Sequence, residues 1–368
     1  AVAYAIGMTN GMTATTFAPD KSATRAQAAA MLVRIYEKLQ TAGKGEHHGF
    51  YAISSYSQLP MAEGMDSISF GWSRMTWADG TAKLATTRAN GNEFCIPSGY
   101  DSAVKTLEQS GTDRNLMVYM DTAAGLNELL SSEEGRAQAV REIVNEVSVS
   151  YRALGHNPYT GVTIDFEGLY RPQKANFTAF LTALQKELKA AGKSLYVCVS
   201  PTLSKSSYYD GYDYRAIGHL ADRVILMAYN YQAMDLSDYL GTEYYKTAAV
   251  APIDQIFASL LDLTDARTGV EDTSKVLLGV QFRNIAWQVD SNGKLVSGTP
   301  VYPDEETLTK RLNQSGTVTG WSQDYQCPYI RYIDESGNQW FAFYEDSDSL
   351  RAKTQAAALR GITGVSYW

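Results

Sequence analysis

The chain has 368 residues, enough for one large domain or two smaller ones, and its 45% hydrophobic and 20% charged residues are typical of a globular protein. Its formal charge of −8, with scattered lysines and arginines, argues against a nucleic-acid-binding protein, which needs a basic surface. No apolar run approaches the ~18 residues of a membrane-spanning helix, so we expect no insertion into a membrane.

The cysteines and histidines are spaced too far apart to form a known metal-binding motif. Cys95, Cys198 and Cys327 are distant from one another, and the histidines form no HExxH pattern. We therefore expect buried free thiols, with one disulfide as the alternative, and neither a metal nor another cofactor.

The first 40 residues read as a loop punctuated by glycine and proline, followed by a helix. Thr24 is the expected N-cap of this helix. Apolar residues then recur at helical spacing, at Ala28, Met31, Leu32, Ile35 and Leu39. A piece this short cannot bury its apolar face alone, so we expect it to pack on the main body or on a repeat outside this chain.

This segment resembles one S-layer homology repeat. The resemblance is carried by Asn10-Gly11, Phe17-Ala18-Pro19-Asp20 and Thr24-Arg25-Ala26-Gln27. Such repeats usually act in threes on cell-wall polysaccharide, so the resemblance implies a cell-wall polymer as a partner. A remnant that only packs on the main domain is the alternative. We assign 1–40 to a partial repeat and 41–48 to a linker.

From residue 49 onward, eight strand-like runs alternate with helical patterns. The runs are FYAISSYS (50–57), DSISFGWS (66–73), NLMVYMD (115–121), GVTIDFE (161–167), SLYVCVS (194–200), RVILMAYNY (223–231), KVLLGVQF (275–282) and GITGVSYW (361–368). Mostly apolar strands that alternate with helices predict a parallel sheet, and eight of them predict a closed (β/α)8 barrel over 49–368. A doubly wound open sheet is the alternative, although no GxGxxG follows the first strand.

The connection between the seventh and eighth runs, residues 283–360, is too long for a single helix. It contains a predicted helix at 304–314 and a predicted hairpin at 329–344. We therefore expect a small insertion on the seventh βα unit, at the face of the barrel where active sites form.

The fourth run places two acids on one face of a buried strand. In GVTIDFE, apolar side chains alternate with Thr163, Asp165 and Glu167. Acids facing the barrel interior cost several kcal/mol each unless they are solvated or shared, and the solvated place is the cleft at the strand's C-terminal end. Two such close carboxylates tend to hold a proton, which predicts a protonated Glu167 that acts as a general acid. A solvated strand end without a catalytic role is the alternative.

The stretch YTGVTIDFEG is similar to the signature of glycoside hydrolase family 18, D-G-x-D-x-D-x-E. Gly161, Asp165 and Glu167 match, whereas Thr160 and Thr163 replace two of the acids. Because Thr163 cannot ionise, the pH optimum or the rate is expected to differ from the family pattern. The resemblance covers essentially all of 49–368 and implies a chitinase-like (β/α)8 barrel.

Two further stretches resemble the same family. LMAYNY resembles the sixth-strand motif, with Met227 and Tyr229 matching and Asn230 in place of an acid. GVSYW resembles the eighth strand and ends in Trp368.

The C-terminal region resembles the spore-cortex-lytic, peptidoglycan-directed branch of the family, which lacks the larger insertion of processive chitinases. The matching residues are Tyr332, Asp334, Gly337, Trp340, Glu345-Asp346, Ser349, Lys353 and Gly361. DSISFGWSRMTWADGTAKL resembles that branch's second strand and the hairpin after it.

The resemblance implies substrate-assisted, retaining hydrolysis. Glu167 would protonate the glycosidic oxygen, Asp165 would orient the substrate acetamide, and Tyr229 would hold the acetamide oxygen. Trp368 would form the floor under the sugar. Further residues expected around the substrate are Met227, Asn230, Thr163, Gln281, Tyr51, Trp72 and Tyr119, with Trp287 and Trp321 on the side of the insertion.

The sequence therefore predicts an enzyme that cleaves β-linked N-acetylglucosamine (GlcNAc) glycans. Peptidoglycan or spore cortex is the first expectation and chitin the next. A catalytically silent sugar-binding barrel and a structural wall-anchored protein are the alternatives. The S-layer-like segment predicts an extracellular or cell-surface location in a bacterium.

Overall fold

The computed structural model describes residues 2–13, 16, 18–52, 58–202 and 210–368. Phe17 of the S-layer-like motif and residues 53–57 at the end of the first predicted strand lie outside the described residues. Within them, no helix has both the length and the apolar character needed to cross a membrane.

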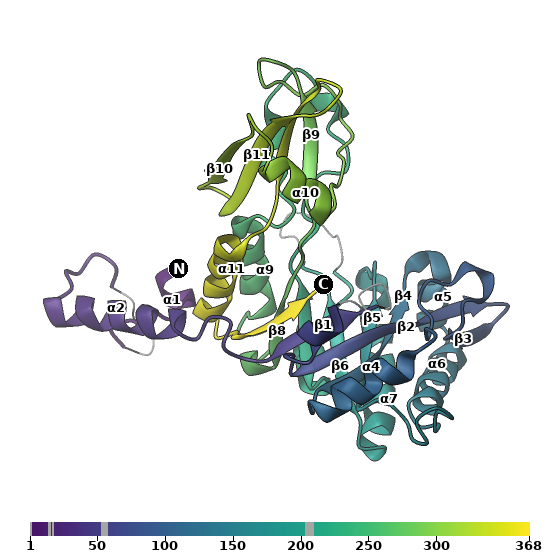
Figure 1. The fold of residues 1–368 in the computed structure, drawn as a ribbon. Coiled ribbons are helices and arrows are strands. Elements are labelled where there is room, and N and C mark those ends of the chain that lie inside the picture. Colours follow the sequence, from purple (N-terminus) through teal and green to yellow (C-terminus); the bar gives the residue numbers. More distant parts are fainter. Residues whose placement is uncertain (1, 14–15, 17, 53–57, 203–209) are drawn as a thin grey trace.

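Eight parallel strands form a closed barrel (Figure 1). They are β1 (His47–Tyr51), β2 (Ser67–Ala78), β4 (Asp113–Met120), β5 (Gly161–Phe166), β6 (Ser194–Val199), β7 (Arg223–Met227), β8 (Val276–Val280) and β13 (Gly364–Tyr367). The ring closes because β1 pairs in parallel with both β13 and β2. Seven strands fall on predicted runs, whereas β1 begins in the predicted linker 41–48 and shares only Phe50 and Tyr51 with the first run. The closed ring confirms the barrel and shows that the open-sheet alternative is wrong.

The helices that follow the strands cover the outside of the barrel. They are α3 (Leu59–Ala62), α4 (Tyr100–Gln109), α5 (Leu126–Ser131), α6 (Glu133–Glu146), α7 (Lys174–Ala190), α8 (Tyr214–Leu220), α9 (Ile253–Leu263) and α11 (Ser347–Leu359). The Phe166 ring of β5 stacks on Phe180 of α7 with centroids 5.2 Å apart. Fully burying a side chain of this kind contributes roughly 1.5–3 kcal/mol. Because Phe166 faces outward, its neighbours Asp165 and Glu167 face the interior.

A hairpin extends β2 beyond the barrel. β3 (Thr81–Ala85) pairs antiparallel with the end of β2, and the turn uses Asp79 and Gly80 with φ of 50° and 72°. Two consecutive positive φ values are what a tight hairpin turn requires. The hairpin predicted after the second strand is therefore present.

The insertion between β8 and β13 is larger than the sequence predicts. It contains β9 (Ile285–Val289), α10 (Glu305–Leu312), β10 (Val318–Ser322), β11 (Cys327–Ile333) and β12 (Gln339–Phe343). The predicted helix and hairpin are α10 and β11–β12, but β9 and β10 extend them into an antiparallel sheet of order β10-β11-β12-β9. This sheet stands above the barrel (Figure 1) and has a separate core, in which Trp287 is fully buried. Trp321 is half-buried on the edge strand β10.

A buried ion pair ties the insertion to the barrel. Glu345 follows β12 and bonds to Lys353 of α11, and their side chains are only 4% and 2% exposed. Burial raises the pKa of Glu345, whereas the adjacent ammonium lowers it. Each charge is buried only because the other is present.

The N-terminal segment consists of α1 (Val2–Ala5) and α2 (Arg25–Leu39). Thr24 caps α2 as predicted, accepting a hydrogen bond from the backbone N–H of Gln27 at 3.2 Å. No residue of α2 is buried, and Leu32 is 67% exposed. The segment bonds to the body at two places: Lys38 donates to the Leu359 carbonyl at 3.0 Å, and Arg360 donates to the Ala5 carbonyl. Of the apolar face expected to pack, Met31, Ile35 and Leu39 are half-buried, whereas Ala28 and Leu32 are exposed.

Candidate active site

The two acids lie at the C-terminal end of β5, where the strand meets the barrel mouth. Asp165 is 3% exposed and Glu167 is half-buried. The backbone N–H of Glu167 donates to the Met120 carbonyl at 2.9 Å, which keeps the chain paired with β4 up to this residue. Gly168, with φ of 78°, then turns the chain away. The alternation seen in the sequence therefore directs both carboxylates inward.

Burial and mutual repulsion govern the protonation of the pair. Burial, followed by the charge of Glu167, raises the pKa of Asp165, and a hydrogen bond from the Cys198 thiol lowers it in part. Burial, followed by the charge of Asp121, raises the pKa of Glu167. The two carboxyls therefore share a proton near neutral pH. Because Asp165 lies deeper, burial favours the proton on Asp165, whereas the sequence predicts it on Glu167.

A third acid, Asp121, follows β4 beside the pair. Its Oδ2 accepts hydrogen bonds from the Tyr119 hydroxyl at 3.1 Å and from Arg74 at 3.3 Å. The Arg74 guanidinium also lies 5.3 Å from the centre of the Tyr119 ring. Burial, followed by the charge of Glu167, raises the pKa of Tyr119, and the charges of Asp121 and Asp165 raise it further, so its hydroxyl lies within the field of the acids. Asp121 and Arg74 are not among the predicted site residues, although an acid directly after a buried barrel strand was the available signal.

Tyr229 follows β7 and reaches toward the same pair. Burial raises its pKa, and the charges of Asp165, Cys198 and Glu167 raise it further, so the phenol is a neutral hydrogen-bond donor. Met227 packs inside the barrel in a cluster that includes Cys198 and contacts Tyr229. Asn230 is exposed with φ of 62°, a conformation that asparagine adopts more readily than most residues.

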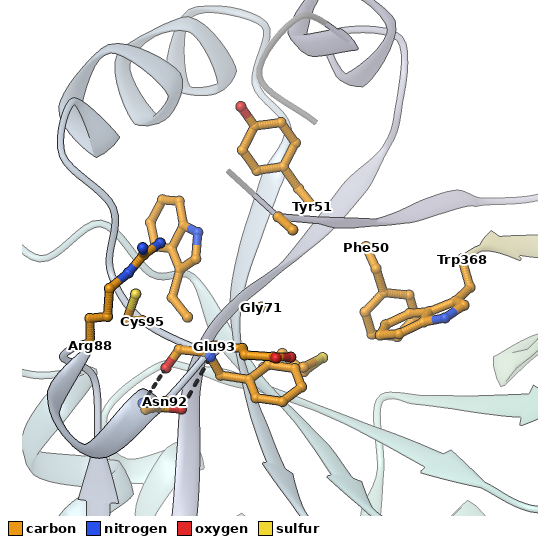
Figure 2. A pocket seen from close by; sticks show the side chains of 13 residues that line it. Phe50, Tyr51, Gly71, Arg88, Asn92, Glu93, Cys95 and Trp368 are labelled. Carbon is orange, nitrogen blue, oxygen red and sulfur yellow. Dashed lines mark hydrogen bonds between the residues drawn. The ribbon is translucent and has the colours of Figure 1, made fainter. Parts of the chain in front are cut away.

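Trp368 and Phe50 form an aromatic wall on the opposite side of the mouth. Their ring centres are 4.8 Å apart with planes at 74°, and Trp368 is 47% exposed. The Trp368 backbone N–H donates to the Val280 carbonyl at 3.0 Å, which extends β13 beside β8. Both rings line a cavity of about 650 Å³ (Figure 2). This volume is within the range of small-ligand sites.

The outer wall of this cavity is the loop between β3 and α4. Asn92 donates to the Phe94 carbonyl at 2.7 Å and accepts from its N–H at 3.1 Å, as the dashed lines in Figure 2 show. The Phe94 ring stacks on Tyr119 with centroids 4.8 Å apart. Among the described residues that line the cavity, the two carboxylates are absent. Phe94 of the cavity wall stacks on Tyr119, whose pKa is raised in part by the charges of Glu167 and Asp165. Phe50, on another side of the cavity, packs against the interior cluster that contains Met227.

The remaining predicted residues divide between the mouth and the core. The Trp72 ring stacks on Phe70 at 3.9 Å, and the Tyr51 ring packs edge-on against Phe70 at 6.0 Å. Both border the cavity, but their rings belong to the outer core, and Figure 2 shows the Tyr51 ring directed away. Gln281 follows β8 with its Oε1 buried. Thr163 is fully buried below the acids, out of reach of the cavity.

The remaining sulfur and histidine groups are dispersed. Cys95, Cys198 and Cys327 are buried free thiols. The part of the chain that the structure describes contains no group of three His, Cys, Asp or Glu side chains that could hold a metal ion.

Comparison with known proteins places this chain in a family. The family model "Glycosyl hydrolases family 18" matches residues 50–368. The cortical fragment-lytic enzyme of Bacillus subtilis is 22% identical over 250 residues, which cover 66% of this chain and 54% of the relative. The chain spans about half the length of the curated relatives it matches.

Solved structures share the fold. The spore cortex-lytic enzyme SleL of Bacillus cereus superimposes with a TM-score of 0.67 at 17% identity, over 88% of this chain and 70% of that one. A chitinase of Chromobacterium violaceum gives a TM-score of 0.68 at 19% identity, over 88% and 93% of the two chains. Because the family model matches residues 50–368, the chain belongs to glycosyl hydrolases family 18.

Proposed function

We propose that this glycoside hydrolase cleaves β-linked GlcNAc glycans with retention of configuration, using Glu167 as general acid and base. The observation that carries the proposal is the Asp165–Glu167 pair, buried at the barrel mouth with the pKa values of both groups raised. A carboxyl that keeps its proton near neutral pH can protonate a leaving group.

The placement of the acids favours participation by the substrate. An ordinary retaining enzyme needs a second carboxylate ~5 Å from the acid, on the opposite side of the bond. Asp165 shares a strand with Glu167, and Asp121 follows the adjacent strand, so all three lie on one side. The 2-acetamido group of GlcNAc supplies the missing nucleophile, an exception known for such enzymes.

Each residue then has a distinct role. Glu167 gives its proton to the glycosidic oxygen while the acetamide oxygen attacks the anomeric carbon. Asp165 accepts the acetamide N–H, and the Tyr229 hydroxyl donates to the acetamide oxygen. Glu167 then removes a proton from water, which attacks from the original leaving side and gives the retained product. The indole of Trp368 stacks under the sugar.

The position of the shared proton links binding to catalysis. The Asp165 Oδ1 atom is buried and has no hydrogen-bond partner among the described residues. An acetamide N–H bonds to this acceptor more strongly when Asp165 is ionised than when it is protonated. Substrate binding therefore moves the shared proton from Asp165 to Glu167, where the reaction needs it.

Peptidoglycan or spore cortex is the substrate we propose first, and chitin second. The names of the cortical fragment-lytic relative and of SleL support the first, and the chitinase neighbour supports the second. We further propose that residues 1–40 are a partial S-layer homology repeat that contacts cell-wall polymer, and that the protein acts outside the cell or at its surface. A silent glycan-binding barrel is the alternative function.

The test compares wild type with Glu167→Gln on peptidoglycan, spore cortex and chitin oligomers. We expect a loss of about 10²–10⁴-fold in turnover with binding largely kept, because the amide cannot transfer a proton. Glu187→Gln, on the exposed face of α7, is the matched control. Equal turnover of wild type and Glu167→Gln would reject the acid. Failure of wild type to cleave any of the three polymers would favour the binding barrel.

A further inference from the structure

A partly exposed ion pair lies beside the general acid at the barrel mouth. Arg74 donates to Asp121 Oδ2 at 3.3 Å, and the two side chains are 31% and 29% exposed. The Tyr119 hydroxyl donates to the same oxygen at 3.1 Å, and the Ala124 N–H donates to Oδ1 at 2.9 Å. Three donors therefore fix the position of the Asp121 carboxylate. None of these groups takes part in the proposed reaction, so the third acid requires an explanation.

A β-bulge in β2 directs Arg74 toward the inside of the barrel. The register of β2 on β4 shifts by one residue between Phe70 and Ser73. One extra residue exchanges the two faces of a strand. Phe70 packs in the outer core before the bulge, and Met75 packs there after it. Arg74 therefore lies on the inner face, opposite Tyr119 of β4.

The pairing of β4 with β5 places Asp121 beside Glu167. Tyr119 of β4 lies opposite Asp165 of β5. The Glu167 N–H, which donates to the Met120 carbonyl at 2.9 Å, continues this pairing beyond the end of β5. Asp121 and Glu167 each come two residues after this opposite pair, on chains about 4.8 Å apart. The two carboxylates are therefore neighbours at the mouth.

The charge of Asp121 acts on the proton of Glu167. It follows burial as the second cause that raises the pKa of Glu167. A neighbouring anion disfavours the ionisation of a carboxyl, so Asp121 keeps the proton on Glu167 to a higher pH. The other charged or titratable groups around Glu167, among the described residues, are Asp165 of β5, Tyr119 of β4, Cys198 of β6, Tyr212 before α8, Tyr229 after β7 and, through Asp121, Arg74 of β2.

We propose that Asp121 is a positioning residue that keeps the reacting proton on Glu167, and that Arg74 and Tyr119 hold its carboxylate in place for this task. The role rests on the proposed function, because it concerns the proton that Glu167 gives to the glycosidic oxygen. Asp121 extends toward alkaline pH the range in which the acid is active, and the opposite charge of Arg74 limits this extension. With threonine at 163 and asparagine at 230, the chain lacks two acids of the family pattern, and Asp121 supplies a negative charge from another strand.

The first test follows the protonation of Glu167 directly and needs no activity. Carbon-13 NMR of protein labelled at the glutamate carboxyls is recorded between pH 4 and pH 10, and the signal that Glu167→Gln lacks assigns the acid. Asp121→Asn keeps the side-chain oxygen that accepts from the Ala124 N–H but removes the charge. The midpoint of the Glu167 titration should therefore fall by about one pH unit.

A matched control makes the shift specific to the mouth. Asp348→Asn removes an exposed aspartate that bonds to Arg351 at 2.8 Å on α11, outside the barrel. This control should leave the midpoint of the Glu167 titration where it is in wild type. An unchanged midpoint in Asp121→Asn, or an equal shift in Asp348→Asn, would overturn the proposal.

Arg74→Met tests the same coupling with the opposite sign. Loss of the guanidinium leaves the charge of Asp121 uncompensated, so the midpoint of the Glu167 titration should rise. Arg74→Lys keeps the positive charge and should restore the midpoint toward that of wild type. General damage to the site does not produce opposite shifts in two variants. A midpoint that stays or falls in Arg74→Met would overturn the proposal, and this variant decides it even where Asp121→Asn does not fold.

The pH profile of kcat/KM, on the substrate that wild type cleaves, separates the possible failures. Its basic limb reports the essential acid of the free enzyme, so Asp121→Asn should move this limb down by about one pH unit. A merely structural Asp121 would lower kcat/KM equally at every pH. A limb unchanged in Asp121→Asn, with turnover still lost in Glu167→Gln, would overturn the role of Asp121 and leave the proposed function intact. A shifted titration in a protein whose Glu167→Gln variant keeps full turnover would support the coupling of Asp121 to Glu167 and reject the proposed function alone.

Discussion

The buried Asp165 carboxyl should make the barrel less stable as the pH rises. Its pKa is raised in the folded protein, chiefly by burial, above the ~3.9 expected for an unfolded aspartate. Below pH 4 the group is protonated in both states and costs nothing. Above pH 4 the unfolded chain loses this proton first, so the free energy of unfolding falls until the pH reaches the folded pKa.

Asp165→Asn removes this dependence and keeps the shape of the side chain. One proton contributes a slope of about 1.4 kcal/mol per pH unit. The stability of Asp165→Asn relative to wild type should therefore rise by about 2–3 kcal/mol between pH 4.5 and pH 6.5. The raised pKa of Glu167 contributes to both proteins and largely cancels in the difference.

Urea unfolding at pH 4.5, 5.5 and 6.5 measures this difference. The exposed Asp238→Asn is the matched control. A pH-independent difference for Asp165→Asn would show that Asp165 ionises freely in the fold. The shared proton, and with it the protonated acid of the mechanism, would then be refuted.

Three further changes test other parts of the structure. Lys353→Met leaves the buried Glu345 without its partner and should lower the free energy of unfolding by about 3–5 kcal/mol. Because burial raises the pKa of Glu345, the loss in urea unfolding should be larger at pH 8 than at pH 5. A loss of stability that does not depend on pH would contradict this. Deleting residues 1–40 should change the free energy of unfolding of the barrel by at most about 0.5 kcal/mol, since α2 buries no residue. A loss of several kcal/mol in urea unfolding would show that the segment supports the barrel. Tyr229→Phe should lower turnover less than Glu167→Gln, and the reverse order would contradict the proposed roles.

The barrel could be predicted because its strands carry a strong and repeated signal. All eight runs are apolar, are separated by helical patterns and lie in the chain order that the closed ring requires. The acids on β5 could be predicted because alternation assigns them to one face. Gly161 was recognised only as part of a motif. The structure explains why the residue is glycine, because a Cβ atom at this position would clash with Ser194 Oγ.

The choice of face on doubly buried strands could not be predicted. Phe50 and Tyr51 are adjacent aromatic residues at the end of β1, and both faces of that strand are covered. A shift of one residue exchanges the two faces, so the sequence could not show that Phe50 meets Trp368 while Tyr51 enters the outer core. Similarly, His48 lies in a polar stretch that was expected to be a linker. Its ring is buried in a strand because Ser366 and Ser69, which are distant in the sequence, hydrogen-bond to it.

The insertion was underestimated for a related reason. β10 is half exposed and contains a glycine, so its sequence shows neither alternation nor an apolar run. It becomes a strand only because β11 offers it an edge, with Val318 to Ser322 pairing antiparallel to Arg331 to Cys327. Strands of this kind depend on tertiary pairing more than on their own residues.

The replacement of family acids by neutral residues shows what sustains the shared proton in this site. Thr160 sits at the base of β5, where its hydroxyl accepts from the Arg114 N–H, far from the pair. Thr163 is neutral and buried, and Asn230 is exposed. Fewer anions near Glu167 would by themselves lower its pKa, yet burial is the largest cause of the raised pKa for both members of the pair. The acid therefore depends on the exclusion of water by the barrel wall more than on the number of neighbouring carboxylates.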